Sequence, residues 1–334
     1  MPSGPRRHLL IALFAIAGTA WSAPCATATA ACTEWIALGG GPARLLVYRS
    51  YPLGERNQNV KRALLVIHGG GRDADNEFRT ALAAAFLAGG LDDTVLISPR
   101  FASNTGANVQ TGCRDTLAAN EAGWVCDVQQ PDSWRAGGGA IGNEKVTSFD
   151  AIDEILRKLA RRQNFPNLQS IVVAGHSAGG MFVTRYEMTN QVHATLGVPV
   201  TYVVSNPNIY AYADTARPAA QQNCAGFNNW PYGLDNRVGY SARLTVEQLR
   251  KQLAERPTTY LLGDLDTLPI PNWDASCSAQ TQGATRLDRG IAFGKYVNEK
   301  YGAKHATVIV RFCGHNSRCM FTAEPALPLL FPKP

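Results

Sequence analysis

Residues 171–180 read IVVAGHSAGG, and they indicate the fold more strongly than any other part of the chain. A short β-branched run leads into a Gly-x-Ser-x-Gly motif centred on Ser177, and a helix-compatible segment, 181–190, follows it. This order is typical of a nucleophile elbow, a sharp turn between strand and helix that holds a serine at its apex. Gly175 and Gly179 would be needed because a side chain there would collide with the neighbouring strand and helix. The alternative is a glycine-rich turn with an incidental serine, but such a turn would not need a strand before the motif and a helix after it.

Strand and helix signals alternate along the central part of the chain. Short apolar runs bounded by turn residues predict strands, and apolar residues at helical spacing predict helices. This alternation predicts an α/β fold with a mostly parallel central sheet, helices on both faces and ligand sites beyond the carboxyl ends of the strands. Besides the elbow, the expected strands are residues 43–51, 61–68, 94–98, 199–205, 258–263 and 306–312, and the expected helices are 77–87, 148–159, 245–255 and 286–301.

A second glycine-rich segment, residues 68–73 (HGGGRD), ends the expected strand 61–68. Consecutive glycines allow a backbone to approach another group closely. In hydrolases with an elbow serine, a loop at this place supplies one N–H for the oxyanion, and the residue after the serine supplies the other. The expected donors are therefore Gly70, or alternatively Gly71, and Ala178. A plain turn or a phosphate loop is the other interpretation, but the G-x-x-x-x-G-K-[ST] pattern of a phosphate loop is absent.

A serine hydroxyl becomes a good nucleophile only beside a base that a third group orients. Among six histidines, His315 alone follows the last expected strand in a glycine-containing loop between two cysteines, and it is the expected base. The segment 263–266 (GDLD) offers two acids, and Asp266 is favoured over Asp264 because it lies further into the loop. The resulting order, Ser177, Asp266 and His315, is the Ser–Asp–His order of enzymes with this elbow.

Together these motifs resemble those of secreted α/β-hydrolases of the esterase and polyester-depolymerase kind. The resemblance covers about residues 60–320 and rests on the HGGG loop, Gly-His-Ser-Ala-Gly, Gly-x-x-Asp-x-x-Pro at 263–269 and the final Gly-His. It implies the α/β-hydrolase fold and a serine hydrolase of carboxylic esters (EC 3.1.1 type) that works through an acyl-enzyme, without metal or cofactor. The alternatives are a serine peptidase or amidase of the same fold, and a non-catalytic binding protein, which usually lacks part of the triad.

Two long irregular segments, residues 101–146 and 208–256, interrupt the expected elements and give no match to the family. A structureless stretch of this length in a compact domain is usually functional, and a surface Ω-loop is the alternative. Both segments carry aromatic residues suited to a partly wet cleft. The expected substrate is therefore a bulky or aromatic ester or a polyester, bound by Trp134, Tyr210 and Trp230. Packing in the core is the alternative for each of these residues.

The N-terminus has the features of an export signal. The basic residues 6–8 (RRH) precede nine apolar residues, 9–17, and small residues then offer cleavage sites of the A-x-A kind. Nine apolar residues are too few to anchor a chain in a bilayer. We expect a signal peptide over residues 1–23 and one catalytic domain over 24–334, secreted or periplasmic and without a membrane anchor. Without the two signal arginines the formal charge is (32 − 2) − 26 = +4, and no basic cluster indicates a nucleic-acid partner.

Eight cysteines in an exported chain predict disulfides rather than metal ligands. No C-x-x-C pair and no Cys/His cluster at zinc spacing occurs, so no metal site is expected. Spacing alone leaves the connectivity open. The expected pairs are Cys113–Cys126, Cys224–Cys277 and Cys313–Cys319, with Cys25–Cys32 as a fourth if the signal is cut before Cys25.

Overall fold

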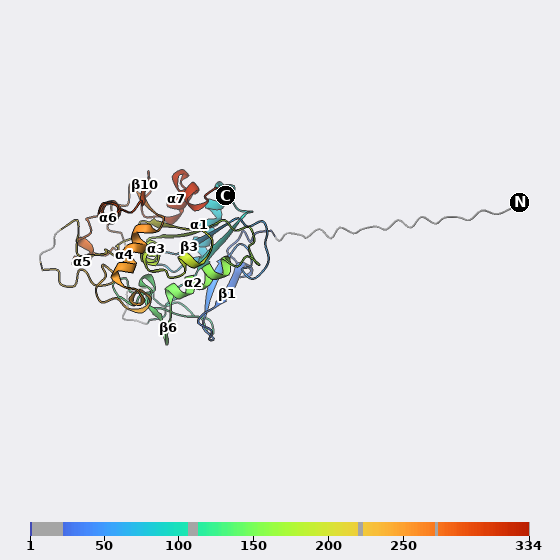
Figure 1. Cartoon of the computed structure of the whole chain (residues 1–334), viewed down its shortest axis with the longest axis horizontal. Coiled ribbons are helices and arrows are strands. Elements are labelled where there is room, and N and C mark those ends of the chain that lie inside the picture. The colour runs from blue at the N-terminus through green and yellow to red at the C-terminus, as the bar shows by residue number, and fades with distance from the viewer. Residues whose placement is uncertain (2–22, 106–112, 220–222, 271–272, 334) are drawn as a thin grey trace.

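The computed structural model describes residue 1 and residues 23–105, 113–219, 223–270 and 273–333. The expected signal peptide, residues 1–23, lies almost wholly outside these described residues. A sheet of eight strands forms the centre of the molecule (Figure 1). Its strands are β1 (Thr33–Ala37), β2 (Arg44–Arg49), β3 (Arg62–Ile67), β4 (Thr94–Pro99), β7 (Ser170–His176), β8 (Val200–Ser205), β9 (Thr258–Gly263) and β10 (Ala306–Val310).

The strand order in this sheet is β1-β2-β4-β3-β7-β8-β9-β10. β2 pairs antiparallel with both β1 and β4, whereas every pairing from β4 to β10 is parallel. The expected mostly parallel sheet is therefore present. Because parallel strands share a direction, the loops after β3, β7, β9 and β10 all emerge at the same edge of the sheet.

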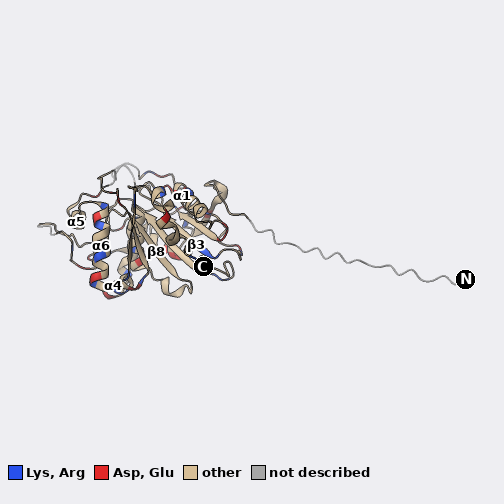
Figure 2. Cartoon of the chain, turned by 90° about the horizontal axis from the view of Figure 1, so that it is seen from above, with Lys and Arg blue, Asp and Glu red and all other residues tan. Residues whose placement is uncertain are grey.

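Helices cover both faces of the sheet, as expected (Figure 1). One apolar core lies under α1 (Ala74–Leu87), α7 (Ser317–Thr322) and α8 (Leu327–Leu330). The larger core, on the other face, lies under α2 (Ser148–Leu159), α3 (Ala178–Thr189), α4 (Val246–Glu255) and α6 (Arg286–Tyr301). Basic and acidic residues are interspersed along the ribbons of α4 and α6 (Figure 2).

Strand β3 shows why the sheet needs two helical layers. All six of its residues are buried. Leu65 and Ile67 belong to the larger core, whereas Leu64 and Val66 belong to the core under α1. Successive side chains of a strand point to opposite faces, so a continuous apolar run must be covered on both sides.

The two insertions contain more regular structure than the sequence predicts. Residues 101–146 include a 3₁₀ turn, Trp134–Ala136, and part of a small hairpin formed by β5 (Gly139–Ala140) and β6 (Asn143–Thr147). Strand β1 and the short helices α5 (Cys277–Gln280), α7 and α8 are further elements that the sequence does not predict, because elements this short carry little periodic signal. In the described part of the chain, no helix combines the length and the apolar character needed to span a bilayer.

Candidate active site

Ser177 lies in the turn between the end of β7 and the start of α3. Its backbone has φ 58° and ψ −116°, a conformation that L-residues rarely adopt. Two glycines allow the strand and the helix to meet this closely. A Cβ on Gly175 would lie 2.3 Å from the carbonyl oxygen of Gly179, and a Cβ on Gly179 would lie 2.1 Å from that of Ile67. The turn therefore has the strand, strained serine and helix expected of a nucleophile elbow.

Three side chains from separate strand ends meet at this turn. Nε2 of His315 lies 2.8 Å from Oγ of Ser177, and its Nδ1 lies 2.7 Å from Oδ2 of Asp266. Asp266 follows β9 and His315 follows β10, and these strands are neighbours in the sheet. A carboxylate only accepts hydrogen bonds, so Nδ1–H donates to Asp266 and Nε2 can accept the serine proton. The alternative acid, Asp264, has a buried Oδ1 without a hydrogen-bond partner in the described part of the chain.

A buried cation lies on the far side of the acid. Nη1 of Arg286 is 3.6 Å from Oδ1 of Asp266, and both side chains are 1% exposed. Burial lowers the pKa of Arg286, and the nearby Asp266 carboxylate opposes that effect. The sequence does not point to Arg286, because nothing in the first turn of an expected helix indicates that an arginine there reaches an acid in another loop.

Three further histidines are held by ring packing or by hydrogen bonds to tyrosine. The ring of His176 is buried 4.6 Å from that of His315, and burial lowers its pKa well below the usual range. His193 and His305 each hydrogen-bond a tyrosine hydroxyl through Nδ1, and burial lowers the pKa of each to about 4. These rings are therefore neutral at pH 7, whereas His315 is the histidine in contact with Ser177.

The segment Gly69–Gly71, called the glycine loop below, passes beside the elbow. A Cβ on Gly69 would lie 4.0 Å from Cβ of Ser177. Buried His68 accepts a hydrogen bond at Nε2 from the N–H of Phe101 (2.9 Å), so its Nδ1–H donates to the carbonyl of Gly69 (2.9 Å). Burial lowers the pKa of His68 to about 3, which keeps the ring neutral.

This hydrogen bond also orients the next N–H. The carbonyl and N–H of a trans peptide point in opposite directions, so holding the Gly69 carbonyl turns the N–H of Gly70 away from His68. That N–H makes no hydrogen bond to any residue that the structure describes. Ala178, the other expected donor, is the first residue of α3, where N–H groups lack acceptors within the helix.

The chain is similar to known proteins in structure. No family model and no curated protein matches the sequence. Poly(aspartic acid) hydrolase-1 from Sphingomonas sp. KT-1 is similar with a TM-score of 0.60 and 22% identity, over 90% of this chain and 98% of that one. The poly(3-hydroxybutyrate) depolymerase from Bordetella parapertussis is similar with a TM-score of 0.60 and 21% identity, over 87% of this chain and 85% of that one. The chain has the α/β-hydrolase fold.

The three aromatic residues expected to bind substrate lie in the core of this α/β-hydrolase fold. Trp134 is 0% exposed and stacks on Phe101, and Tyr210 is 0% exposed and stacks on Phe293. Trp230 is 3% exposed and donates its indole N–H to a backbone carbonyl. Side chains with so little accessible surface cannot line a cleft, so the interpretation is corrected. These residues pack the two insertions onto the core of the sheet.

Apolar surface beside Asp266 comes from other residues. Leu265 and Leu268 flank Asp266 and are 56% and 65% exposed. Trp273, which is half-buried, lies under the guanidinium groups of Arg286 and Arg289. Nothing in the sequence indicates whether a leucine in a loop is exposed, so Leu265 and Leu268 could not be predicted as part of this surface.

The cysteines pair as expected, in four disulfides: Cys25–Cys32, Cys113–Cys126, Cys224–Cys277 and Cys313–Cys319. The last pair encloses His315 in a short ring. Within the described residues, no three His, Cys, Asp or Glu side chains are grouped as metal ligands.

Proposed function

We propose that the protein is a serine hydrolase that cleaves carboxylic esters through an acyl-enzyme on Ser177. The observation that carries the proposal is the continuous hydrogen-bond chain from Ser177 through His315 to Asp266. A serine, a base and an orienting carboxylate in this geometry form the recurrent arrangement for acyl transfer.

In the acylation step, Oγ of Ser177 attacks the ester carbon while its proton passes to Nε2 of His315. The carbonyl oxygen becomes an oxyanion, which the N–H groups of Gly70 and Ala178 bind. The intermediate then collapses, the bond to the alcohol oxygen breaks, and the leaving alkoxide takes the proton from Nε2. Water repeats the sequence on the acyl-enzyme, with His315 again as base, and releases the acid and free Ser177. Asp266 stabilises the imidazolium form of His315 in both halves.

We propose that the substrate is a bulky or aromatic ester or a polyester, whose apolar part contacts Leu265, Leu268 and Trp273. The support is the apolar surface that these residues leave accessible beside Asp266. An amide substrate is the second candidate. It is favoured by the structural neighbour that is a poly(aspartic acid) hydrolase, since the units of that polymer are joined by amide bonds.

We also propose that residues 1–23 are a signal peptide and that residues 24–334 form one exported catalytic domain. Four disulfides support an oxidising compartment, because such bonds persist mainly in secreted and periplasmic proteins. Expression with and without residues 1–23, followed by N-terminal sequencing of the exported product, tests the cleavage site.

The test of activity uses the purified protein with p-nitrophenyl esters of graded chain length, aryl esters, polyesters and peptides. Wild type should hydrolyse esters, and a fluorophosphonate probe should label Ser177. Ser177→Ala should lose labelling and at least about 10⁴-fold in kcat. Asp266→Asn should lose roughly 10⁴-fold, whereas the matched change Asp264→Asn should leave kcat within about twofold. Stoichiometric labelling of Ser177→Ala would assign the nucleophile elsewhere, and faster cleavage of peptides than of esters would favour the amide candidate.

A further inference from the structure

We infer that Arg72 is a positioning residue for the glycine loop and that Asp115 holds Arg72 in place. This inference rests on the proposed function, since it concerns the N–H of Gly70 as an oxyanion donor. It assigns a role to Asp115, a residue of the first insertion, which the proposed chemistry does not otherwise use.

The glycine loop cannot fix its own conformation. Its three residues lack side chains, and glycine has access to more backbone conformations than any other residue. A donor of the oxyanion hole must nevertheless be oriented before the charge develops, because reorganisation during the reaction would cost rate. The loop therefore needs contacts from outside itself.

Arg72 supplies two of those contacts, one from its backbone and one from its side chain. Its N–H donates to the carbonyl of Gly69 (3.2 Å), which His68 also binds, and its Nη1 donates to the carbonyl of Gly70 (2.9 Å). The first carbonyl belongs to the peptide that carries the N–H of Gly70, and the second belongs to the next peptide along the chain. The two contacts restrict the backbone on both sides of the Gly70 α-carbon.

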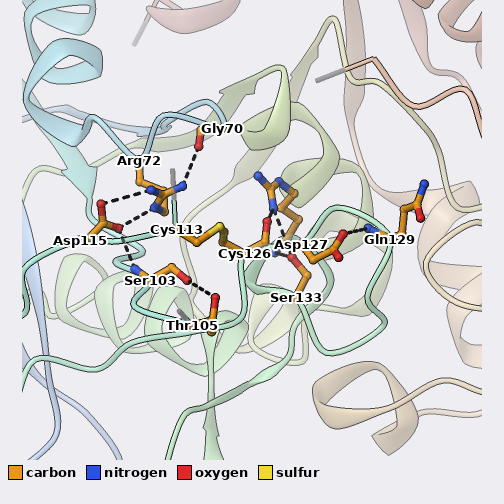
Figure 3. The surroundings of a disulfide bond; sticks show 11 residues. Gly70, Arg72, Ser103, Thr105, Cys113, Asp115, Cys126, Asp127, Gln129 and Ser133 are labelled. Carbon is orange, nitrogen blue, oxygen red and sulfur yellow. Dashed lines mark hydrogen bonds and ion pairs between the residues drawn. A yellow bond between two sulfur atoms is a disulfide. The ribbon is translucent and has the colours of Figure 1, made fainter. Parts of the chain in front are cut away.

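The side chain of Arg72 is itself fixed by a bidentate ion pair. Nε lies 2.5 Å from Oδ2 of Asp115 and Nη2 lies 3.2 Å from Oδ1, which leaves Nη1 directed at Gly70 (Figure 3). The side chains of Arg72 and Asp115 are 6% and 18% exposed. A planar guanidinium can hold a carboxylate with one edge and a carbonyl with another nitrogen, whereas a lysine ammonium is a single point charge.

Asp115 is in turn fixed by the insertion around it. Its Oδ2 accepts a hydrogen bond from the N–H of Ser103 (2.8 Å), and its own N–H donates to the Ser103 carbonyl (2.9 Å). It lies two residues after Cys113, which is disulfide-bonded to Cys126 (Figure 3). Burial raises the pKa of Asp115, but the hydrogen bonds from Arg72 and Ser103 outweigh it, and the pKa is lower than usual. The pair therefore stays ionised in mildly acidic solution.

The contacts predict a specific kinetic effect. Arg72 is bonded to the glycine loop and not to the triad side chains, so its loss should disturb the oxyanion donor while leaving the nucleophile and base in place. The oxyanion forms only as the reaction proceeds, so kcat should fall while KM changes little.

The experiment compares Arg72→Gln, Arg72→Lys and Asp115→Asn in the full protein. With p-nitrophenyl acetate, Arg72→Gln should lose about tenfold to a hundredfold in kcat with KM within about twofold. Arg72→Lys should recover part of this loss. Adding Asp115→Asn to Arg72→Gln should lower kcat no further, because both changes remove the same support of the glycine loop, the Arg72–Asp115 ion pair. The affinity for a trifluoromethyl ketone, which forms a tetrahedral adduct with the serine, should weaken by the same factor as kcat/KM.

The matched control is Arg243→Gln. Arg243 makes another bidentate pair, with Asp150 at 2.6 and 2.8 Å, and this pair makes no contact with the glycine loop, so kcat and ketone affinity should stay unchanged. Unchanged kcat in folded Arg72→Gln or Asp115→Asn would overturn the inference. So would a loss of kcat without a matching loss of ketone affinity. If wild type neither takes the fluorophosphonate label nor cleaves esters, it is the proposed function that fails, and the inference fails with it.

Discussion

Arg286 lies directly behind Asp266: its Nη1 is 3.6 Å from Oδ1, while Nδ1 of His315 is 2.7 Å from Oδ2. The carboxylate is thus held between a permanent cation and the ring that it orients. Both partners come from elements that follow it in sequence, Arg286 from the start of α6 and His315 from the loop after β10.

Replacing Arg286 by Gln should lower kcat by about tenfold or more. The variant removes a buried cation that stabilises the carboxylate, and the acid is then free to turn away from His315. The measurement is kcat together with the rate of fluorophosphonate labelling, which should fall in parallel. Arg289→Gln is the control, since Arg289 is a buried arginine of the same helix whose hydrogen bonds go to Gly283, Asn208 and Asp274. An equal loss in both variants would indicate general damage to α6 rather than support of the acid.

Removing the Cys313–Cys319 disulfide should reduce activity more than stability. The ring that it closes is short, so the entropic stabilisation is modest, about 2–3 kcal/mol. Misplacing the base by about 1 Å can lower kcat by about a hundredfold. The double variant Cys313→Ser/Cys319→Ser should therefore show a small drop in Tm and a large drop in kcat. Cys25→Ser/Cys32→Ser, which opens a ring of similar length that contains none of Ser177, Asp266 and His315, should show a similar small drop in Tm and an unchanged kcat; an equal drop in kcat for the two variants would refute this role.

Glu77 should make the protein less stable as the pH rises from about 4.5 to 7. Burial on α1 raises the pKa of Glu77 from 4.5 to about 7, and a hydrogen bond with Ser317 of α7 opposes the shift. Below 4.5 both states are protonated, and between the two values the unfolded state loses a proton that the folded state keeps. The free energy of unfolding should fall by about 3 kcal/mol across this range and level off above it. Urea unfolding of wild type and Glu77→Gln at pH 4 to 8 is the measurement, and parallel curves would contradict the assignment.

Leu268→Ser and Trp134→Ala should affect different properties. Leu268 is exposed beside Asp266, so its replacement should leave Tm nearly unchanged and lower kcat/KM for p-nitrophenyl benzoate, an ester with a bulky aromatic acyl part, about threefold relative to p-nitrophenyl acetate. Trp134 is buried, so its replacement should lower the free energy of unfolding by about 3–5 kcal/mol. A selective loss of aryl-ester activity in Trp134→Ala, without loss of stability, would return that residue to the substrate site.

The parts of the site that the sequence predicts are those carried by short linear motifs at strand ends. Ser177, Asp266 and His315 each follow a recognisable strand, and parallel pairing brings strand ends to one edge. The exposure of Trp134 depends instead on how a long insertion folds back on the sheet, which local composition does not encode. Arg72 and Asp115 pair across 43 positions of sequence, and no spacing rule connects them.

The backbone of Ser177 sets a limit on how this protein could be made more stable. A non-glycine residue at φ 58° and ψ −116° is strained by about 1–3 kcal/mol. Ser177→Gly would relieve that strain, so at this position the substitution that favours the folded state also deletes the proposed nucleophile. Selection for thermostability alone would therefore favour glycine at position 177. Directed evolution that did not also screen for turnover would enrich inactive variants.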